Sequence, residues 1–310
     1  MKINRSVSCA KVAVILAAFN GVEFIFEQIQ SILRQKGIDL HVFVNVDRSF
    51  DGTEEKISEW ISTEPRLTLL PIDNRFCGAA KNFFHLIREV DFSMFDYISL
   101  ADQDDIWLPG KLCRAVEQLI CRGTDGYSSD VIAFWQSGHS RLIRKSYPQR
   151  RWDYLFESPG PGCSFVLSRR LSDELKSFLQ QNVEAAGLIE FHDWFIYAFA
   201  RAHGYQWTID NCAGLLYRQH QSNYLGANLG LGAFAWRARR VLDGWGLEQS
   251  RLIADLVGLG ANPIVRQWSR GNRSGLLWLA FQSWHCRRRP LDRLWFFVSC
   301  VTLAAFGLRS

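Results

Sequence analysis

Short apolar runs rich in β-branched residues alternate with amphipathic stretches between residue 11 and about residue 121. The apolar runs predict strands at residues 12–19, 40–46, 67–72 and 97–100. The stretches between and after them predict helices at residues 23–36, 53–63, 79–90 and 109–121. This alternation is typical of βαβ units, so we predict an α/β fold with a mostly parallel, Rossmann-like sheet flanked by helices.

Sheets of this kind bind ligands beyond the carboxyl ends of their strands. The residues that follow the predicted strands are therefore the first candidates for a site. They are Asn20-Gly21, Asp47, Asn74 and Asp102-Gln103-Asp104-Asp105. We expect these four loops to meet at one edge of the sheet.

The segment from Tyr97 to Trp107 carries the clearest chemical signal, because a hydrophobic strand leads directly into Asp102, Asp104 and Asp105. Clustered carboxylates repel one another unless a cation and a polyanionic ligand neutralise them. Mg²⁺ in proteins commonly uses one or two carboxylates together with phosphate oxygens. A solvated acidic turn that caps the next helix is the alternative, but the position at a strand's carboxyl end favours a metal site.

A second group of polar residues follows the apolar run at residues 213–217. Arg218 is suited to binding diphosphate oxygens, and His220 as a neutral imidazole can ligate a divalent metal. A solvated surface histidine is the alternative for His220. Lys81 either reaches a phosphate or lies on the solvent face of its helix.

The chain resembles family 2 glycosyltransferases of the GT-A fold, particularly the bacterial rhamnosyltransferase-like branch, over about residues 11 to 227. The resemblance rests on six short motifs that occur in the family's order. They are Ala18-Phe19-Asn20-Gly21, Asp47 with Asp51-Gly52-Thr53, Lys81-Asn82-Phe83, Asp102-x-Asp104 with Ile106-Trp107, His192-Asp193-Trp194, and Tyr217-Arg218-Gln219-His220. The loop Arg48-Ser49-Phe50 departs from the family, whose members commonly carry Gly-Ser and a small polar residue there.

The resemblance implies a role for each candidate residue. Phe19, Asn20 and Asp47 would line the site for the nucleotide base and ribose, and Asp102 would approach the ribose. Asp104 would ligate Mg²⁺ or Mn²⁺ on the diphosphate, with help from His220. The rest of the expected donor-binding set is Asn74, Lys81, Gln103 and Arg218.

Asp193 is the candidate catalytic base, since inverting transfer needs one carboxylate to take the proton of the acceptor hydroxyl. In the family this acid follows Glu or His, and here it follows His192. The alternative is that Asp193 caps a helix over residues 194–203, because Asp is a favoured N-cap residue. Trp107 and Trp194 are either sugar-stacking platforms or core residues.

The last part of the chain differs in charge from the rest. Residues 226–310 contain twelve arginines, no lysine and four acids, within a chain whose net charge is +5. Residues 294–308 are uncharged, but they are shorter than the ~17–25 residues that span a bilayer. We therefore expect a GT-A domain at 1–225 and a helical, basic extension at 226–310. With Arg287-Arg288-Arg289 upstream, the uncharged stretch predicts an in-plane membrane anchor, and a docked core helix is the alternative.

The eight cysteines show neither a C-x-x-C pair nor a zinc-like spacing, which favours a reduced, cytoplasmic environment. We predict an inverting glycosyltransferase that moves a sugar, with rhamnose as the candidate, from a dTDP- or UDP-sugar to a glycan or lipid-linked acceptor. The process would be cell-surface polysaccharide biosynthesis at the inner face of the membrane, with no nucleic-acid partner. A nucleotidyltransferase would be expected to carry a Gly-rich phosphate loop, which Phe19-Asn20-Gly21 does not supply. A non-enzymatic module that binds membranes or polyanions through the arginine-rich tail is a third alternative.

Overall fold

The computed structural model describes residues 10–71, 76–220 and 243–307. These residues form two compact units. Unit 1 comprises the described residues up to Ser146, Pro159–Asp193 and Tyr205–His220. Unit 2 comprises Tyr147–Ser158, Trp194–Gly204 and the described residues from 243 onward. The predicted boundary between residues 225 and 226 lies outside the described residues and stays a prediction.

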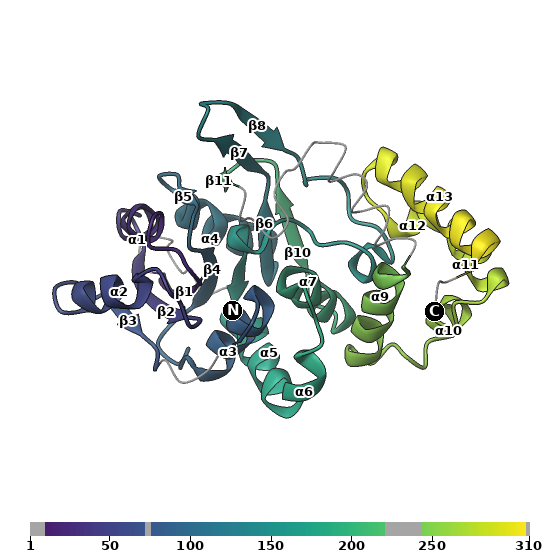
Figure 1. Ribbon diagram of the computed structural model, residues 1–310, viewed down its shortest axis with the longest axis horizontal. Helices are drawn as coiled ribbons and strands as arrows, with labels where there is room; N and C mark the ends of the chain where they lie inside the picture. Colours follow the sequence, from purple (N-terminus) through teal and green to yellow (C-terminus); the bar gives the residue numbers. More distant parts are fainter. Residues whose placement is uncertain (1–9, 72–75, 221–242, 308–310) are drawn as a thin grey trace. The chain divides into compact units, whose positions relative to one another are not determined.

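A mostly parallel sheet forms the centre of unit 1 (Figure 1). Its predicted strands are β1 (Lys11–Ala18), β2 (Asp39–Val46), β3 (Leu67–Leu69) and β4 (Tyr97–Asp102). They are joined by β6 (Gly126–Ser129), β9 (Val166–Ser168) and β10 (Trp207–Asp210). The order among the described residues is β10-β6-β9-β4-β1-β2-β3, and β9 runs antiparallel to both of its neighbours. The predicted α/β architecture is therefore confirmed.

Helices cover both faces of this sheet, which explains why β1 is apolar along nearly its whole length rather than alternating. The helices of unit 1 include α1 (Ile25–Leu33), α2 (Thr53–Ile61), α3 (Ala79–Glu89), α4 (Lys111–Arg122), α5 (Arg169–Gln181) and the short α6 (Val183–Ala186). The apolar residues of α1 and α4 form one core with alternate residues of β1. α3 packs against β1 and β2, and α5 packs against α3 and β4.

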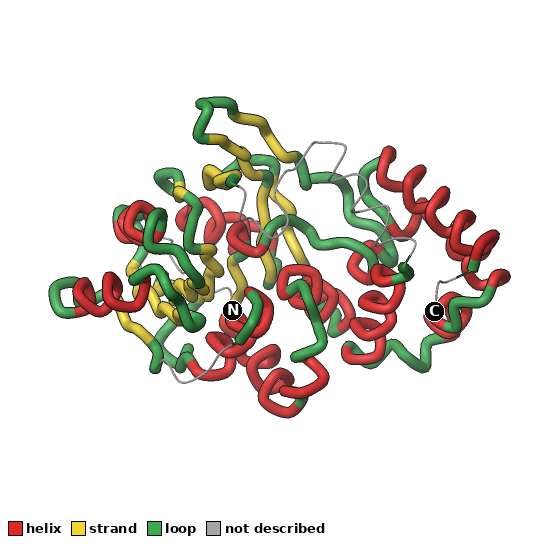
Figure 2. Tube along the Cα trace, viewed as in Figure 1, coloured by secondary structure: helices red, strands yellow, loops and turns green. Residues whose placement is uncertain are grey.

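A smaller sheet in unit 1 brings residues from distant parts of the sequence together (Figure 2). It contains β5 (Ile106–Trp107), β11 (Leu215–Gln219), β7 (Val131–Trp135) and β8 (Ser140–Ile143), in that order. β5 directly follows the aspartate cluster and pairs with β11, which carries Arg218. This pairing places the end of the 213–220 segment beside the cluster.

The segment at residues 122–160, which its composition predicts to be rich in loops, contains three strands. β6 has the sequence Gly-Tyr-Ser-Ser and is nevertheless buried along its length. A Cβ atom on Gly126 would lie 2.0 Å from the ring of Trp207, so the glycine is needed for close packing against β10. The sequence analysis predicted no strand at residues 126–129, because Gly and Ser carry no apolar signal.

The described residues of unit 2 form helices and loops, with no β-strand. Its helices are most of α7 (His192–Ala202), then α9 (Trp245–Leu256), α10 (Pro263–Ser269), α11 (Arg273–Phe281), α12 (Ser283–Cys286) and α13 (Pro290–Phe306). The side chains of Asn262 and Asn272 cap α10 and α11. α11 packs on α13 around Leu276, Leu303 and Ala304. None of the described helices is both long and apolar enough to cross a membrane.

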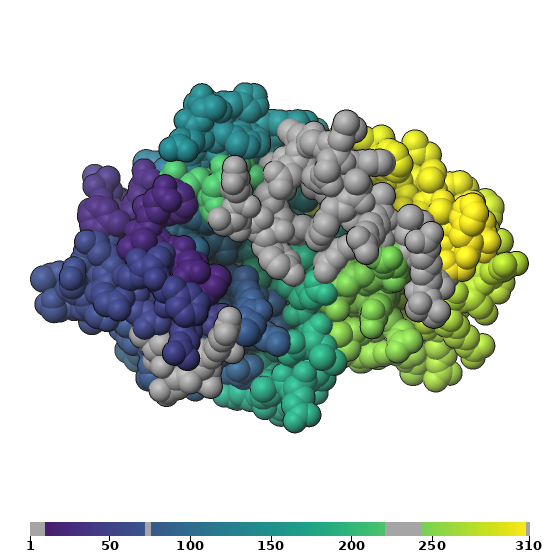
Figure 3. All heavy atoms as spheres, in the orientation of Figure 1, coloured from purple at the N-terminus to yellow at the C-terminus, as the bar shows by residue number. Residues whose placement is uncertain are grey.

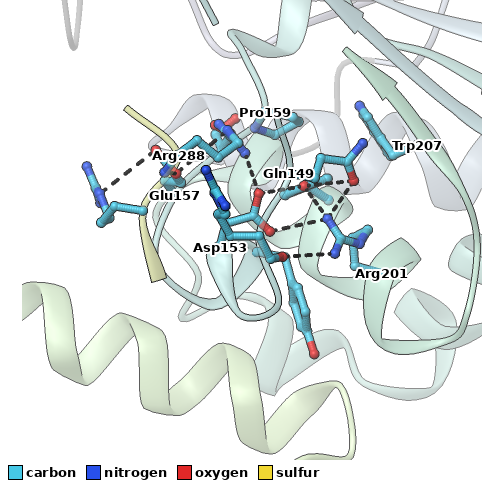
Figure 4. A network of polar contacts seen from close by, with 12 residues as sticks. Gln149, Asp153, Glu157, Pro159, Arg201, Trp207 and Arg288 are labelled. Carbon is cyan, nitrogen blue, oxygen red and sulfur yellow. Dashed lines mark hydrogen bonds and ion pairs between the residues drawn. The ribbon is translucent and has the colours of Figure 1, made fainter. Parts of the chain in front are cut away.

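A buried ionic network holds unit 2 together (Figure 4). Asp153 is fully buried and pairs with Arg288 at 3.1 Å and with Arg201 at 3.2 Å. The hydroxyl of Tyr197 lies 3.1 Å from the same carboxylate, and Glu157 accepts a hydrogen bond from the backbone N–H of Arg288. The middle arginine of the 287–289 run is therefore part of the interior of unit 2. Arg288 therefore adds no exposed charge to the predicted membrane anchor.

Candidate active site

The carboxyl ends of β1, β2 and β4 lie side by side at one edge of the main sheet. Ala18 pairs with Val46, and Ala17 pairs with Asp102, the last residue of β4. The loops that leave this edge carry the predicted residues Phe19, Asn20, Asp47, Gln103 and Asp104. The structure thus brings the candidates from three strands together. Asn74 lies outside the described residues.

Gln103 joins two of these loops. The backbone N–H of Phe19 donates to Oε1 of Gln103 at 2.6 Å, and Nε2 of Gln103 donates to the carbonyl of Phe19 at 2.8 Å. A Cβ atom on Gly21 would lie 2.3 Å from Oε1 of Gln103, so this arrangement requires a glycine there. Gln103 therefore positions the β1–α1 loop, and the ring of Phe19 stays about half exposed at the edge.

Asp47 and Asn20 also hold backbone groups. The carboxylate of Asp47 accepts hydrogen bonds from the N–H groups of Arg48, Phe76 and Cys77 at 2.8–3.0 Å. Oδ1 of Asn20 accepts a hydrogen bond from the N–H of Phe50 at 2.9 Å. These bonds order the loop in which this chain departs from the family. Contact of Asp47 or Asn20 with a nucleotide stays a prediction.

Lys81 and its neighbour Asn82 have different environments on α3. Lys81 is exposed, whereas Asn82 is buried and donates to the carbonyls of Ala18 and Asn45 at 3.3 Å. Asn82 therefore ties α3 to the ends of β1 and β2. The Lys81-Asn82-Phe83 motif therefore does lie at the edge of the main sheet. The residue that bonds to the strand ends there is Asn82 rather than Lys81.

The carboxylates of Asp102, Asp104, Asp105 and Asp193 interact electrostatically. Burial, followed by the charges of Asp104 and Asp193, raises the pKa of Asp102 to about 7. Burial, followed by the charges of Asp104 and Asp102, likewise raises the pKa of Asp105 well above its usual range. The structure therefore brings Asp193, which is distant in sequence, close enough to the β4 cluster for their charges to interact.

Asp104 and His220, the two predicted metal ligands, are in direct contact. Oδ2 of Asp104 lies 2.7 Å from Nε2 of His220, and the imidazole stacks on the ring of Phe24 at 5.1 Å. Both side chains are mostly buried. A carboxylate oxygen and an imidazole nitrogen at hydrogen-bond distance form a donor pair that suits a divalent cation.

Arg218 contacts the aspartate loop from the second sheet. Its Nε donates to the carbonyl of Asp104 at 2.7 Å, and its Nη2 donates to Glu27 at 2.5 Å. The rings of Phe24 and Phe134 lie 4.8 and 4.7 Å from the guanidinium. Arg218 therefore fixes the backbone of the cluster, and its predicted contact with a diphosphate remains untested. Glu27 carried no sequence signal beyond its place on an amphipathic helix.

Further polar side chains lie beside the carboxylates. Ligand atoms of Asp102, Asp105 and Cys163 lie within 4.8 Å of one another. Burial lowers the pKa of Lys111 to about 7, and its Nζ lies 3.5 Å from the centre of the Trp107 ring. Lys111 and Cys163 were not predicted as site residues, because only the folded chain shows that these side chains are buried beside the carboxylates.

Asp193 lies in the first turn of α7, which begins at His192 rather than at residue 194. Asp193 therefore does not hold the N-cap position that the alternative interpretation gave it. The ring of His192 packs on Phe83 at 4.1 Å, and burial lowers its pKa to about 4. A Cβ atom on Gly162 would lie 2.2 Å from Nε2 of His192. A neutral, closely packed imidazole thus fixes the start of the helix that carries Asp193.

The two tryptophans of the motifs are core residues. Trp107 is buried beneath Lys111, and Trp194 is buried in unit 2, where its indole N–H donates to the carbonyl of Tyr154 at 3.0 Å. Both environments agree with the packing alternative. Neither side chain presents its ring as an open platform for a sugar.

The fold is that of GT-A glycosyltransferases. The structure aligns with TarS 1-349 of Staphylococcus aureus at a TM-score of 0.53 and 12% identity, over 96% of this chain and 92% of that one. It also aligns with the mannosyltransferase PcManGT of Pyrobaculum calidifontis, solved with GDP-Man and Mn²⁺, at a TM-score of 0.50 and 17% identity. That alignment covers 96% of this chain and 88% of the other. At these identities the likeness shows the fold alone.

The sequence comparisons define the family. Residues 13–175 match the family described as glycosyl transferase family 2. The chain is 37% identical over 287 residues to the dTDP-rhamnosyl transferase RfbG of Shigella flexneri, covering 92% of this chain and 99% of the relative. This protein therefore belongs to glycosyl transferase family 2. The predicted resemblance is confirmed, and neither the nucleotidyltransferase nor the non-enzymatic alternative gains support.

Proposed function

We propose that this protein is an inverting, metal-dependent glycosyltransferase that transfers a sugar from a dTDP- or UDP-sugar, with dTDP-rhamnose as the first candidate. The acceptor would be a glycan or a lipid-linked glycan in cell-surface polysaccharide synthesis. The observation that carries the proposal is the convergence of Asp102, Asp104 and Asp193 in a family 2 chain. The name of the Shigella flexneri relative supports the choice of dTDP-rhamnose.

Asp104 and His220 are the proposed ligands of Mg²⁺ or Mn²⁺, because their donor atoms already lie 2.7 Å apart. Mutual repulsion among the carboxylates, which contributes to the raised pKa of Asp102, is what a cation would relieve. Cys163 is a poorer ligand, since burial holds the pKa of its thiol well above its usual range and a hard cation prefers oxygen. When bound, the ion would neutralise charge on the diphosphate and so favour its departure.

The other proposed roles follow from position. Phe19, Asn20, Asp47 and Asn74 would contact the nucleotide, and Asp102 and Gln103 would lie at the ribose. Lys81 and Arg218 would add positive charge near the diphosphate. Of these, Asn20, Asp47, Gln103 and Arg218 also hold the loops in place through the hydrogen bonds described above. Loss of any one of them would therefore disturb both the shape of the site and its contacts.

Asp193 is the proposed general base. It would take the proton of the acceptor hydroxyl while that oxygen attacks the anomeric carbon from the side opposite the diphosphate. One such displacement inverts the anomeric configuration. Asp102 and Asp104 are less suitable, because engagement with a cation lowers the basicity of a carboxylate.

A thermal-shift screen of dTDP-rhamnose, UDP-sugars and GDP-sugars, each with Mg²⁺, Mn²⁺ or excess chelator, tests the proposal. A donor present at ~100 times its Kd should stabilise the protein by about 2.7 kcal/mol. We expect this gain with dTDP-rhamnose and metal, and a smaller gain with chelator or in Asp104→Asn. Equal stabilisation by donor in wild type with chelator would contradict metal dependence, and no stabilisation by any nucleotide sugar would contradict the proposed activity.

A lipid-linked acceptor would place the enzyme at the inner face of the cell membrane. We propose a peripheral contact there through the C-terminal extension. The lack of a described helix that could span a bilayer leaves surface binding as the mode of contact for the described residues. The described part of this extension belongs to unit 2.

A further inference from the structure

The last helices of unit 2 expose large apolar side chains. Leu291, Leu294, Trp295 and Val298 of α13 are each more than two-fifths exposed. Phe281, at the end of α11, and Trp284 of α12 are more than half exposed. We call these six residues the outer face. Atoms of α13, in yellow, lie at the visible surface in Figure 3.

The four residues of α13 form an apolar stripe along that helix. On α13 they follow the i, i+3, i+4, i+7 pattern of one helical side. Cys300, Leu303 and Ala304 are buried on another side of the same helix, where α11 packs. The ring of Phe281 contacts Phe297 of α13 at 5.9 Å, and Arg293 lies 4.2 Å from the Trp284 ring. These contacts join the exposed rings of α11 and α12 to α13.

The helices that carry the outer face have a positive net charge. Arg266, Arg270, Arg273 and Arg289 are exposed on or beside α10–α13, whereas Asp292 is the only acid between residues 263 and 307. Arg288 and Arg293 do not add to this exposed charge. Arg288 is buried against Asp153, and Arg293 donates to the carbonyls of Arg287 and Arg288.

We propose that the outer face binds the surface of an anionic membrane, with α13 lying in the plane of the interface. An apolar stripe in a helical segment whose exposed charges are arginines is the pattern of in-plane helices, and tryptophan favours the depth of the lipid headgroups. A second copy of this chain fits less well. In a twofold dimer the outer faces of the two copies would pack on each other, which would bring arginines of like charge together.

This assignment deepens the proposed membrane contact but does not depend on sugar transfer, so the two can fail separately. The test is sedimentation of the full-length protein with vesicles of phosphatidylcholine containing about 30% phosphatidylglycerol, compared with phosphatidylcholine alone. We expect the wild type to sediment with the anionic vesicles and to be released as salt rises, because salt screens the arginines. The double variant Leu294→Glu/Trp295→Glu should lose at least about tenfold in partition.

The matched control is Met94→Glu/Leu142→Glu, which places two acids at apolar side chains of unit 1 that are 68% and 55% exposed. It should sediment like the wild type. All three proteins should keep the same melting temperature and the same stabilisation by donor. A wild type that stays in the supernatant, or a face variant that sediments like the control, would overturn the assignment. So would concentration-dependent dimers that disappear in the face variant without any vesicle binding by the wild type.

Discussion

The acids of the site differ because their surroundings differ. Asp102 ends a strand and is buried beside two other carboxylates, which raises its pKa to about 7. Asp104 contacts an imidazole. Asp193 lies in the first turn of α7, apart from the strand end that carries the other two acids. It is not one of the proposed ligands of the cation, which leaves it as the candidate base.

Replacing Asp193 by Asn should remove the base while keeping the shape of the side chain. Loss of a general base typically lowers the rate about 10²- to 10⁴-fold. We expect this loss in the transfer rate of Asp193→Asn, with unchanged donor affinity and melting temperature measured on the same preparation. Near-wild-type turnover would exclude the assignment, and a variant that unfolds would show that the acid serves the helix instead.

His192 should make the protein sensitive to mild acid. Its folded pKa of about 4 lies below its usual value of 6.5, so the unfolded chain binds the proton more readily. This contribution to stability is present above pH 6.5 and is lost as the pH falls toward 4. At pH 5 the loss from this residue should be about 2 kcal/mol relative to pH 7.5.

Urea unfolding of wild type and His192→Leu at both pH values measures this loss. The variant should lose less stability between the two than the wild type does, by roughly that amount. Equal losses in the two proteins would mean that the imidazole accepts a proton inside the fold.

At the level of elements, the sequence predicted the strands and helices that have a clear hydrophobic periodicity. The first four strands and the helices between them match within a few residues, because buried strands read as apolar runs and helices as amphipathic stretches. β6 was missed because its Gly and Ser residues carry no apolar signal. The start of α7 was predicted at residue 194 but lies at His192, whose ring packs on Phe83.

The same limit applies to the candidate site. Residues that directly follow strands were predicted correctly as lying at the edge, since the ends of neighbouring parallel strands must meet. Residues that reach the edge through packing were not. Glu27, Cys163 and Lys111 come from a helix face, a short turn and a helix start, and only tertiary contacts bring them to the carboxylates.

Gly162→Ala should move the start of α7. The added Cβ would lie 2.2 Å from Nε2 of His192, so the ring and the adjacent Asp193 must shift. A displaced catalytic group can lower kcat roughly 10- to 100-fold. We expect such a drop with little change in donor affinity, and partial recovery in Gly162→Ala/His192→Ala, where the clash is removed.

Gly246→Ala is the matched control for this substitution. Gly246 lies in α9, and among the described residues a Cβ atom there would meet nothing within 4 Å beyond its chain neighbours and the nearby backbone of its own helix. Its kcat should equal that of the wild type. If Gly162→Ala behaves in the same way, the contact with His192 does not position the base.

At the scale of the whole molecule, some arginines near the C-terminus are buried and others are exposed. Composition alone does not show which is which. Arg288 and Arg289 are neighbours in sequence, yet Arg288 is buried and Arg289 is exposed. The partner that makes the difference is Asp153, which lies 135 residues away along the chain. A count of arginines predicted a basic surface, but only the fold shows which of them stabilise unit 2.

Removing one partner of the buried pair should therefore destabilise the protein far more than removing an exposed neighbour. In Arg288→Met the carboxylate of Asp153 stays buried, and Arg201 is its remaining ion-pair partner among the described residues. Breaking a buried ion pair by removing one partner typically costs about 3–5 kcal/mol. Arg289→Met should change the free energy of unfolding by less than about 0.5 kcal/mol. The double variant Asp153→Asn/Arg288→Met should be less destabilised than the sum of its single changes, because the two residues interact directly. Urea unfolding of Arg288→Met, Arg289→Met, Asp153→Asn and the double variant provides these values. An Arg288→Met protein as stable as Arg289→Met would show that the network contributes nothing to folding.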